Sequence, residues 1–247
     1  MLRFDSDEYW LAHRWDRDQT LRDTHPRVAS ILLEQEELTF GAVENALQRL
    51  ATRSGAQCRI LDLGCGMGRI PRLLAERYGA KVSITLADIN PTTLLRATQQ
   101  LPAGVLEGST SVSIYDAGNV WNREFDIVLC MDVFHHLTRL DLALRSIAKS
   151  VSSGGFLIGN VFLSGEYRAF DRKKYGILGS LRRGALCALG SSLHRLPVSR
   201  LARLIRRRGW SRISPVDRDY FLGILTGSFD ICSQDEGVYL WFQATVC

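Results

Sequence analysis

Three glycines on alternate positions follow an apolar run in the stretch Ile60-Leu-Asp-Leu-Gly-Cys-Gly-Met-Gly68. A β-strand that ends in closely spaced glycines and leads into a helix lets a ligand approach its backbone, with unpaired N–H groups of the helix facing that ligand. The spacing is not the dinucleotide pattern G-x-G-x-x-G, because Arg69 occupies the third glycine position, and a Walker phosphate loop is absent. The stretch predicts a ligand-binding strand end, with a tight turn that binds nothing as the alternative.

Polar residues also follow the next apolar runs of the chain. Asp88 lies about 20 residues beyond the glycines, where a carboxylate accepts hydrogen bonds from the two hydroxyls of a ribose. Asp116 ends a further run and can accept a hydrogen bond from an exocyclic amine. A polar cluster at 132–136 follows the apolar run 125–130. Because the carboxyl ends of parallel strands meet at one sheet edge, these residues are predicted to share one site.

Apolar runs alternate with helical patterns from residue 58 onward. Continuous apolar strands separated by helices are typical of a parallel sheet with helices on both faces. The predicted strands are 58–63, 82–87, 112–115, 125–130 and 155–162, and the predicted helices are 69–77, 91–100 and 140–150. The sequence therefore predicts an α/β fold.

The two ends of the chain lack this alternation. Residues 1–55 are predicted to form an N-terminal helical cap of two or three helices, with the clearest helical spacing at 38–51. Residues 56–247 are predicted to form the ligand-binding domain, with a helical insertion after the fifth strand at 164–197. A helix at 198–208 and a final antiparallel hairpin strand at 238–246 complete the expected order.

Taken together, the ordered motifs resemble the class I S-adenosylmethionine-dependent methyltransferases, especially small-molecule and quinone-type enzymes with a D-x-x-x-H-H-L signature. The matching residues, within 56–163, are the segments 60–68 and 125–137, Asp88, Asp116 and the pair Gly154-Gly155. The resemblance implies a Rossmann-like, mostly parallel sheet of seven strands whose last strand is antiparallel. It also implies S-adenosylmethionine as the cofactor.

The resemblance further implies where the cofactor lies. The implied cofactor-binding residues are Asp62, Gly64, Cys65, Gly66, Asp88, Ile89, Asp116, Ala117, Met131 and Tyr9. Asp62 and the glycines would surround the methionyl part, and Asp88 would hold the ribose. Ile89 would lie against the adenine, Asp116 near its amino group, and the Met131 backbone beside the sulfonium.

Two groups of residues are candidates for proton transfer. His135 and His136 are predicted at the edge where an acceptor arrives, and an imidazole titrates in the range that a general base needs. The alternative is that they only shape the turn into the next helix. Tyr9 and His13 lie one helical turn apart in the cap, where the alternative is aromatic packing onto the sheet.

The insertion is the predicted source of acceptor specificity, because pocket lids commonly arise as excursions from a fixed sheet edge. Its apolar stripe favours a hydrophobic or aromatic acceptor. Residues 164–212 also hold thirteen Lys or Arg residues against two acidic residues, within a formal net charge of +5 for the chain. These cations would meet an anionic group or a membrane surface that carries a lipid-borne acceptor, or they simply solvate the helices.

Composition limits the remaining classes. A chain of 247 residues with 46% hydrophobic residues can bury a full core. We expect a cytoplasmic protein, because the sequence shows neither a secretory leader nor an apolar run of membrane-spanning length. The six cysteines form no CxxC pair and no zinc-ligand spacing, so we expect reduced thiols and no metal.

The predicted function is methylation of a small, apolar or aromatic molecule at oxygen, nitrogen or carbon, in secondary metabolite, quinone or lipid biosynthesis. One alternative is an RNA methyltransferase whose cations at 200–212 bind phosphates. Against it, the sequence has no separate RNA-binding module and no Asn/Asp-Pro-Pro-Tyr motif after the fourth strand. The other alternative is a non-catalytic partner subunit with this fold. The sequence leaves the acceptor and the oligomeric state open.

Overall fold

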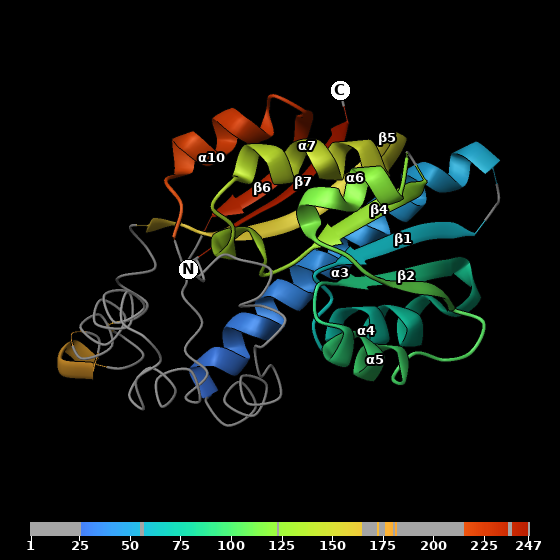
Figure 1. Ribbon diagram of the computed structural model, residues 1–247, viewed down its shortest axis with the longest axis horizontal. Coiled ribbons are helices and arrows are strands. Elements are labelled where there is room, and N and C mark those ends of the chain that lie inside the picture. The colour runs from blue at the N-terminus through green and yellow to red at the C-terminus, as the bar shows by residue number, and fades with distance from the viewer. Residues whose placement is uncertain are drawn as a thin grey trace, which may run out of the picture.

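One seven-stranded sheet forms the centre of the protein (Figure 1). The computed structural model describes residues 26–54, 57–122, 124–164, 172, 176–179, 181, 215–236 and 239–246. The strands are β1 (Cys58–Leu63), β2 (Val82–Asp88), β3 (Leu106–Ser111), β4 (Phe125–Cys130), β5 (Val151–Phe162), β6 (Phe229–Glu236) and β7 (Tyr239–Val246). They follow the order β3-β2-β1-β4-β5-β7-β6, and β7 is antiparallel to both of its neighbours. The predicted α/β sheet with an antiparallel last strand is confirmed.

Helices cover both faces of this sheet. The helices are α3 (Pro26–Ser54), α4 (Arg69–Tyr78), α5 (Pro91–Thr98), α6 (Ala117–Val120), α7 (Leu140–Ser150) and α10 (Arg218–Leu225). Figure 1 shows α6, α7 and α10 on one side of the sheet and α4 and α5 on the other. Helix α3 packs on the α4 side, where Val43 and Ala46 are fully buried in the same core cluster as Leu74 of α4. The sheet therefore separates two apolar cores.

Alternation along the central strands explains the two cores. In β1, Ile60 points into the core beneath α3, α4 and α5, whereas Leu61 and Leu63 point into the core beneath α6, α7 and α10. Both faces of a central parallel strand are buried, so it reads as a continuous apolar run in the sequence. This is why β1, β2 and β4 start and end within about one residue of their predicted bounds.

The third strand was predicted in the wrong place. The structure puts β3 at Leu106–Ser111, with alternating half-buried and exposed residues, because this strand is at the edge of the sheet. The apolar residues at 112–115 lead instead into a 3₁₀ turn, Ile114–Asp116, so Asp116 follows β3 by a turn. An edge strand carries few apolar residues, and its polar sequence hid it.

Three further points concern the helices. The described part of the cap is one continuous helix, α3, and the prediction of two or three helices across the N-terminal region extends into residues 1–25, outside the described residues. Helix α10 was not predicted. The helix at 198–208 and nearly all of the insertion lie outside the described residues, and the division into cap and domain stays a prediction. Within the described residues, no helix combines the length and the low polarity that a membrane span requires.

We expect Gly159→Ala to destabilise the fold, because β5 passes very close to two aromatic rings at this glycine. A Cβ atom there would lie 2.9 Å from both Phe134 Cε2 and Phe242 Cζ. Overpacking of this kind costs about 1–3 kcal/mol. Gly108→Ala on edge strand β3 is the matched control, since a Cβ there meets nothing within 4 Å. Urea unfolding of both variants measures the effect, and equal free energies of unfolding would contradict the close packing at Gly159.

Candidate functional site

The glycine loop after β1 holds three residues with left-handed backbone conformations. The φ angles are 82° at Gly64, 53° at Gly66 and 78° at Gly68. A Cβ at Gly64 would lie 2.4 Å from Val133 Cγ2, and one at Gly68 would lie 2.9 Å from Ala97 Cβ, so packing requires both glycines. A Cβ at Gly66 would meet nothing within 4 Å. The middle glycine therefore borders open space, as a backbone that a ligand approaches should.

Hydrogen bonds attach this loop to the end of β2. The Cys65 N–H donates to Ala87 O at 3.0 Å, and the Gly66 N–H donates to Asp88 Oδ2 at 2.9 Å. The other Asp88 oxygen, Oδ1, accepts from the Asn90 N–H at 2.8 Å. The Ile89 N–H also bonds to Asp88, and since a carboxylate has about four acceptor positions, Asp88 keeps capacity for a further donor such as a ribose hydroxyl. Its position fits the predicted cofactor contact.

A second buried acid lies beside Asp88. Asp62 is only 3% exposed, and burial, together with the charge of Asp88, raises its pKa to about 7. Burial also raises the pKa of Asp88, although the Asn90 and Gly66 N–H groups partly oppose this. Desolvation, and then the Asp62 charge, raise the pKa of the Cys130 thiol. Such a pocket favours a cationic ligand group, which would stabilise the ionised Asp62.

The end of β4 carries a strained residue that the sequence reasoning left without a role. Asp132 has a positive φ of 59°, the only such non-glycine residue in the part of the chain that the structure describes. Its N–H donates to Asn160 Oδ1 at 2.6 Å, and Asn160 Nδ2 donates back to Asp132 Oδ1 at 3.3 Å. Asn160 is fully buried on β5. A conformation of this kind costs about 1–3 kcal/mol and is concentrated at functional sites.

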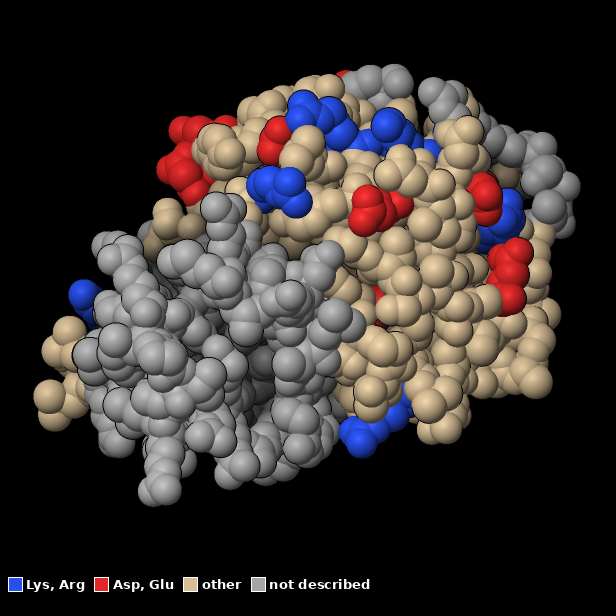
Figure 2. Space-filling view, in the orientation of Figure 1, with Lys and Arg blue, Asp and Glu red and all other residues tan. Residues whose placement is uncertain are grey.

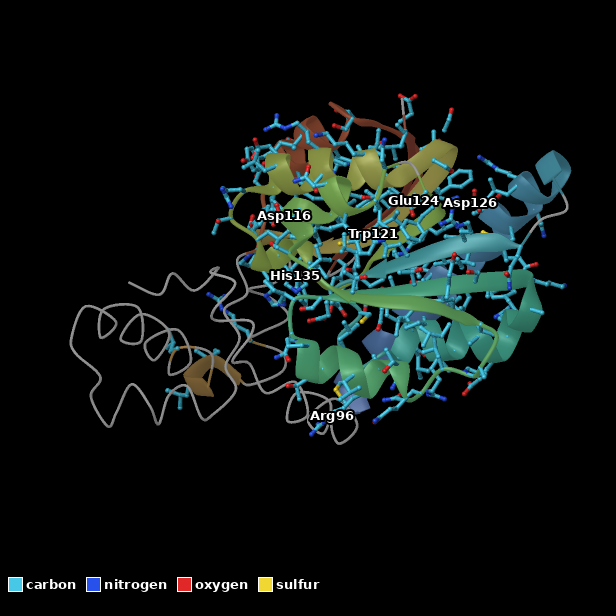
Figure 3. All side chains as sticks on the ribbon, turned by 45° about the vertical axis from the view of Figure 1, so that its right-hand side comes forward. Arg96, Asp116, Trp121, Glu124, Asp126 and His135 are labelled. Carbon is cyan, nitrogen blue, oxygen red and sulfur yellow. The ribbon has the colours of Figure 1, made fainter. Side chains whose placement is uncertain are left out.

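Aromatic rings line the same edge beyond β4. The His135 ring lies 4.3 Å from the His136 ring and 4.6 Å from the Phe162 ring, between centroids. Phe162 in turn stacks on Tyr239 at 4.0 Å. His135 is 2% exposed, whereas His136 is half-buried. Figure 3 shows Asp116 and His135 at one end of the sheet, far from Glu124 and Asp126 at the other end.

The remaining predicted residues lie around this edge. Ile89 follows β2 and is half-buried, and Asp116 is exposed while Ala117 is fully buried. The half-buried Met131 follows β4, and its sulfur lies 3.9 Å from Thr39 Oγ1 of α3. The structure thus brings the predicted cofactor residues from 62 to 131 to one edge of the sheet. Tyr9 and His13 lie outside the described residues.

Most of the predicted basic segment, 164–212, lies outside the described residues. Arg172, at the edge of that gap, is exposed. Acidic and basic side chains are interspersed over the described surface that Figure 2 shows. Among the residues for which coordinates are described, His, Cys, Asp and Glu form no group of three or more that is placed to hold a metal ion.

A family model described as a methyltransferase domain matches residues 61–157, which span the glycine loop, Asp88, Asp116 and the β4 end. Residues 61–157 are therefore similar to a methyltransferase domain. The sequence places only Val133 and Phe134 between Asp132 and His135, so the D-x-x-x-H-H-L spacing itself is not present in this domain.

Two curated relatives and one solved structure to which this chain is similar are methyltransferases by name. A ribosomal RNA small subunit methyltransferase C from Erwinia tasmaniensis is 32% identical over 42% of this chain and 32% of its own length. A ubiquinone biosynthesis O-methyltransferase from Pseudomonas aeruginosa is 25% identical over 69% and 65%, respectively. The chain therefore spans less than two thirds of the length of these relatives. Magnesium protoporphyrin IX methyltransferase from Synechocystis, solved with bound S-adenosylmethionine, aligns over 100% of this chain and 99% of its own at 14% identity, with a TM-score of 0.63.

We expect the stability of this domain to depend on pH through Asp62. The pKa of Asp62 is raised from 3.8 when exposed to about 7 in the fold, so between these values the folded state binds the proton more tightly than the unfolded state. The contribution of Asp62 to the free energy of unfolding is complete below about pH 4 and is lost as the pH rises through 7. The loss is at most about 1.4 kcal/mol per pH unit.

Urea unfolding across pH 4.5–8 measures this dependence. We expect Asp62→Asn to lose less stability than the wild type as pH rises over that range. Asp141→Asn is the control, because Asp141 pairs with Arg145 near the surface of α7. Parallel pH curves for the wild type and Asp62→Asn would show that Asp62 ionises normally.

Proposed function

We propose that this chain transfers the methyl group of S-adenosylmethionine to a small, apolar or aromatic acceptor at oxygen, nitrogen or carbon. The observation that supports this most directly is the glycine loop. Its open side at Gly66 lies beside two buried carboxylates at the carboxyl edge of the sheet, where ligands bind in open α/β sheets. The methyltransferase domain match across 61–157 and the resemblance to small-molecule methyltransferases supply the reaction type.

The residues present fit the cofactor. Asp88 would accept a hydrogen bond from a ribose hydroxyl, and Ile89 and Asp116 would meet the adenine ring and its amino group. Asp62 and the glycine loop would surround the cationic methionyl group, whose charge favours the ionised Asp62. S-adenosylmethionine, when bound, supplies a methyl group that is already activated by its sulfonium. The protein then has to orient the acceptor and exclude water, and orientation alone can supply about 7–11 kcal/mol.

The aromatic rings beyond β4 support a flat, apolar acceptor. Phe162, Tyr239 and His135 form a continuous series of ring contacts next to Asp132 and His136. His135 and Phe162 are nearly fully buried, whereas Tyr239 and His136 are half-buried, so these last two rings are the ones that another planar group could meet. The names of two relatives, a ubiquinone biosynthesis enzyme and a magnesium protoporphyrin IX enzyme, point to flat acceptors for those proteins.

His136 is the better candidate for a general base. His135 is 2% exposed and packs against Phe162, so we assign it to holding the aromatic wall in place. His136 is only half-buried, so an acceptor at this edge of the sheet would reach it more readily than it would reach His135. Asp132 adjoins this pair, and its strained backbone is fixed by Asn160, which sets the direction of the β4 end.

The first test offers radiolabelled S-adenosylmethionine to cell extracts divided into lipid-soluble, water-soluble and RNA fractions. We expect the purified protein to label a compound in the lipid-soluble fraction. Label in the RNA fraction alone would favour the alternative that the ribosomal RNA relative represents. No label in any fraction, with cofactor binding intact, would favour a non-catalytic partner subunit.

The second test removes the carboxylate of Asp88. We expect Asp88→Ala to weaken binding of S-adenosylhomocysteine by at least tenfold, because both the ribose contact and the anchor of the Gly66 N–H are lost. Isothermal titration calorimetry measures the affinity, and circular dichroism checks the fold. Asp141→Ala on α7 is the control, and equal affinities of the two variants would refute the ribose contact.

The third test separates the two histidines on whichever fraction acquires label. We expect His136→Ala to lower kcat by about 10²–10⁴-fold and to abolish the acid limb of the pH–rate profile. His135→Ala should instead lower the melting temperature while the acid limb remains. An unchanged pH–rate profile in His136→Ala would exclude a base role for this residue.

A further inference from the structure

A groove lies between α3 and the β6–β7 hairpin, at the opposite edge of the sheet from β2 and β3. Its volume is about 380 Å³, and its lining includes Glu34, Glu37, Leu38, Gly41, Trp241 and Gln243. Pockets of about 300–1,000 Å³ are large enough for small organic ligands. None of these residues belongs to the methyltransferase site described above.

Two buried donors in the lining have no partner. The Trp241 side chain is 6% exposed and that of Gln243 is 1% exposed. The Trp241 Nε1 and Gln243 Nε2 groups make no hydrogen bond with any described residue, while Gln243 Oε1 accepts from Ser233 Oγ at 3.5 Å. A buried polar group without a partner is rare in folded proteins, so two of them in the lining of one pocket are donors that an acceptor bound there would satisfy.

The rim of the groove adds charge of one sign. Glu34 and Glu37 are exposed on the first half of α3, and neither forms an ion pair with a described residue. Between rim and floor, Leu38, Ala42 and the Trp241 ring supply apolar surface. The groove therefore combines two exposed carboxylates with an apolar wall, and its lining includes the two side chains, Trp241 and Gln243, whose N–H donors are buried without a partner.

We propose that this groove binds a small organic cation that also carries a carbonyl or amide oxygen. The oxygen would accept hydrogen bonds from Trp241 Nε1 and Gln243 Nε2, and the cationic group would lie between Glu34 and Glu37. The apolar body of the ligand would pack on Leu38 and on the indole ring. This site is independent of methyl transfer and of S-adenosylmethionine binding.

Nα-benzoyl-argininamide is a suitable probe, since it has an aromatic ring, amide oxygens and a guanidinium. Its neutral counterpart, Nα-benzoyl-citrullinamide, has nearly the same shape. We expect calorimetry to show binding of the cationic probe at least fivefold tighter than that of the neutral one, with the difference removed in a Glu34→Gln, Glu37→Gln double variant. Absence of binding by the cationic probe, or equal affinity of the two probes, would overturn the proposal.

Gly41 provides a matched pair of variants to locate the binding. A Cβ at Gly41 meets nothing within 4 Å, so Gly41→Ala leaves the groove open and Gly41→Phe fills it. We expect Gly41→Ala to bind the probe as the wild type does and Gly41→Phe to lose at least tenfold in affinity. Equal binding by both variants would place the probe elsewhere and overturn the proposal.

The indole N–H of Trp241 gives a direct readout. In a ¹⁵N spectrum its cross-peak is the one missing from Trp241→Phe, which keeps an aromatic ring but no donor. We expect this cross-peak to move downfield as the probe is added to the wild-type protein. A cross-peak that stays in place while other signals titrate would show that the probe binds without the indole N–H of Trp241 and would overturn the proposal.

Discussion

The candidate site depends on one buried carboxylate. Asp88 accepts from the Gly66 N–H with one oxygen and from the Asn90 N–H with the other, and so joins the loop after β1 to the start of α5. Asn90 itself caps α5, because its Oδ1 accepts from the N–H groups of Thr92 and Thr93. Charge-assisted bonds of this kind are stronger than neutral ones. A single side chain therefore sets the conformation of a left-handed loop and the start of a helix together.

Burial of the same carboxylate is electrostatically unfavourable when no ligand is bound. Asp62 and Asp88 are both nearly fully buried, so desolvation raises the pKa of each, and the charge of Asp88 raises the pKa of Asp62 further. Selection for stability alone would favour apolar residues of similar volume at these two positions. Two buried carboxylates are reasonable where a bound cationic ligand offsets their negative charge. A sulfonium and an ammonium group would supply that positive charge. Departures from local folding rules are expected at functional sites.

Much of this arrangement could be predicted from the sequence, for reasons that differ between elements. The strands β1, β2 and β4 are buried on both faces and so appear as apolar runs, and the left-handed loop appears as glycines. Strand β3 was missed because an edge strand needs few apolar residues. The pairing of Asp132 with Asn160 was also missed, since it depends on the register between β4 and β5 rather than on any local pattern. Only that register brings two polar residues of distant segments together.

Helix α3 is a wall of both candidate sites, and its packing decides how they relate. On one side Glu36 pairs with Arg69 beside the glycine loop and Thr39 contacts Met131, whereas Glu34, Leu38 and Gly41 face the groove. Coupling between the sites would need a second position of α3 in which both ligands bind differently. Thr39, Val43 and Ala46 are fully buried against the sheet, and a close-packed interface changes between discrete arrangements rather than by gradual shifts. A helix held at this one position serves each ligand as a fixed surface, so the two sites are expected to bind independently.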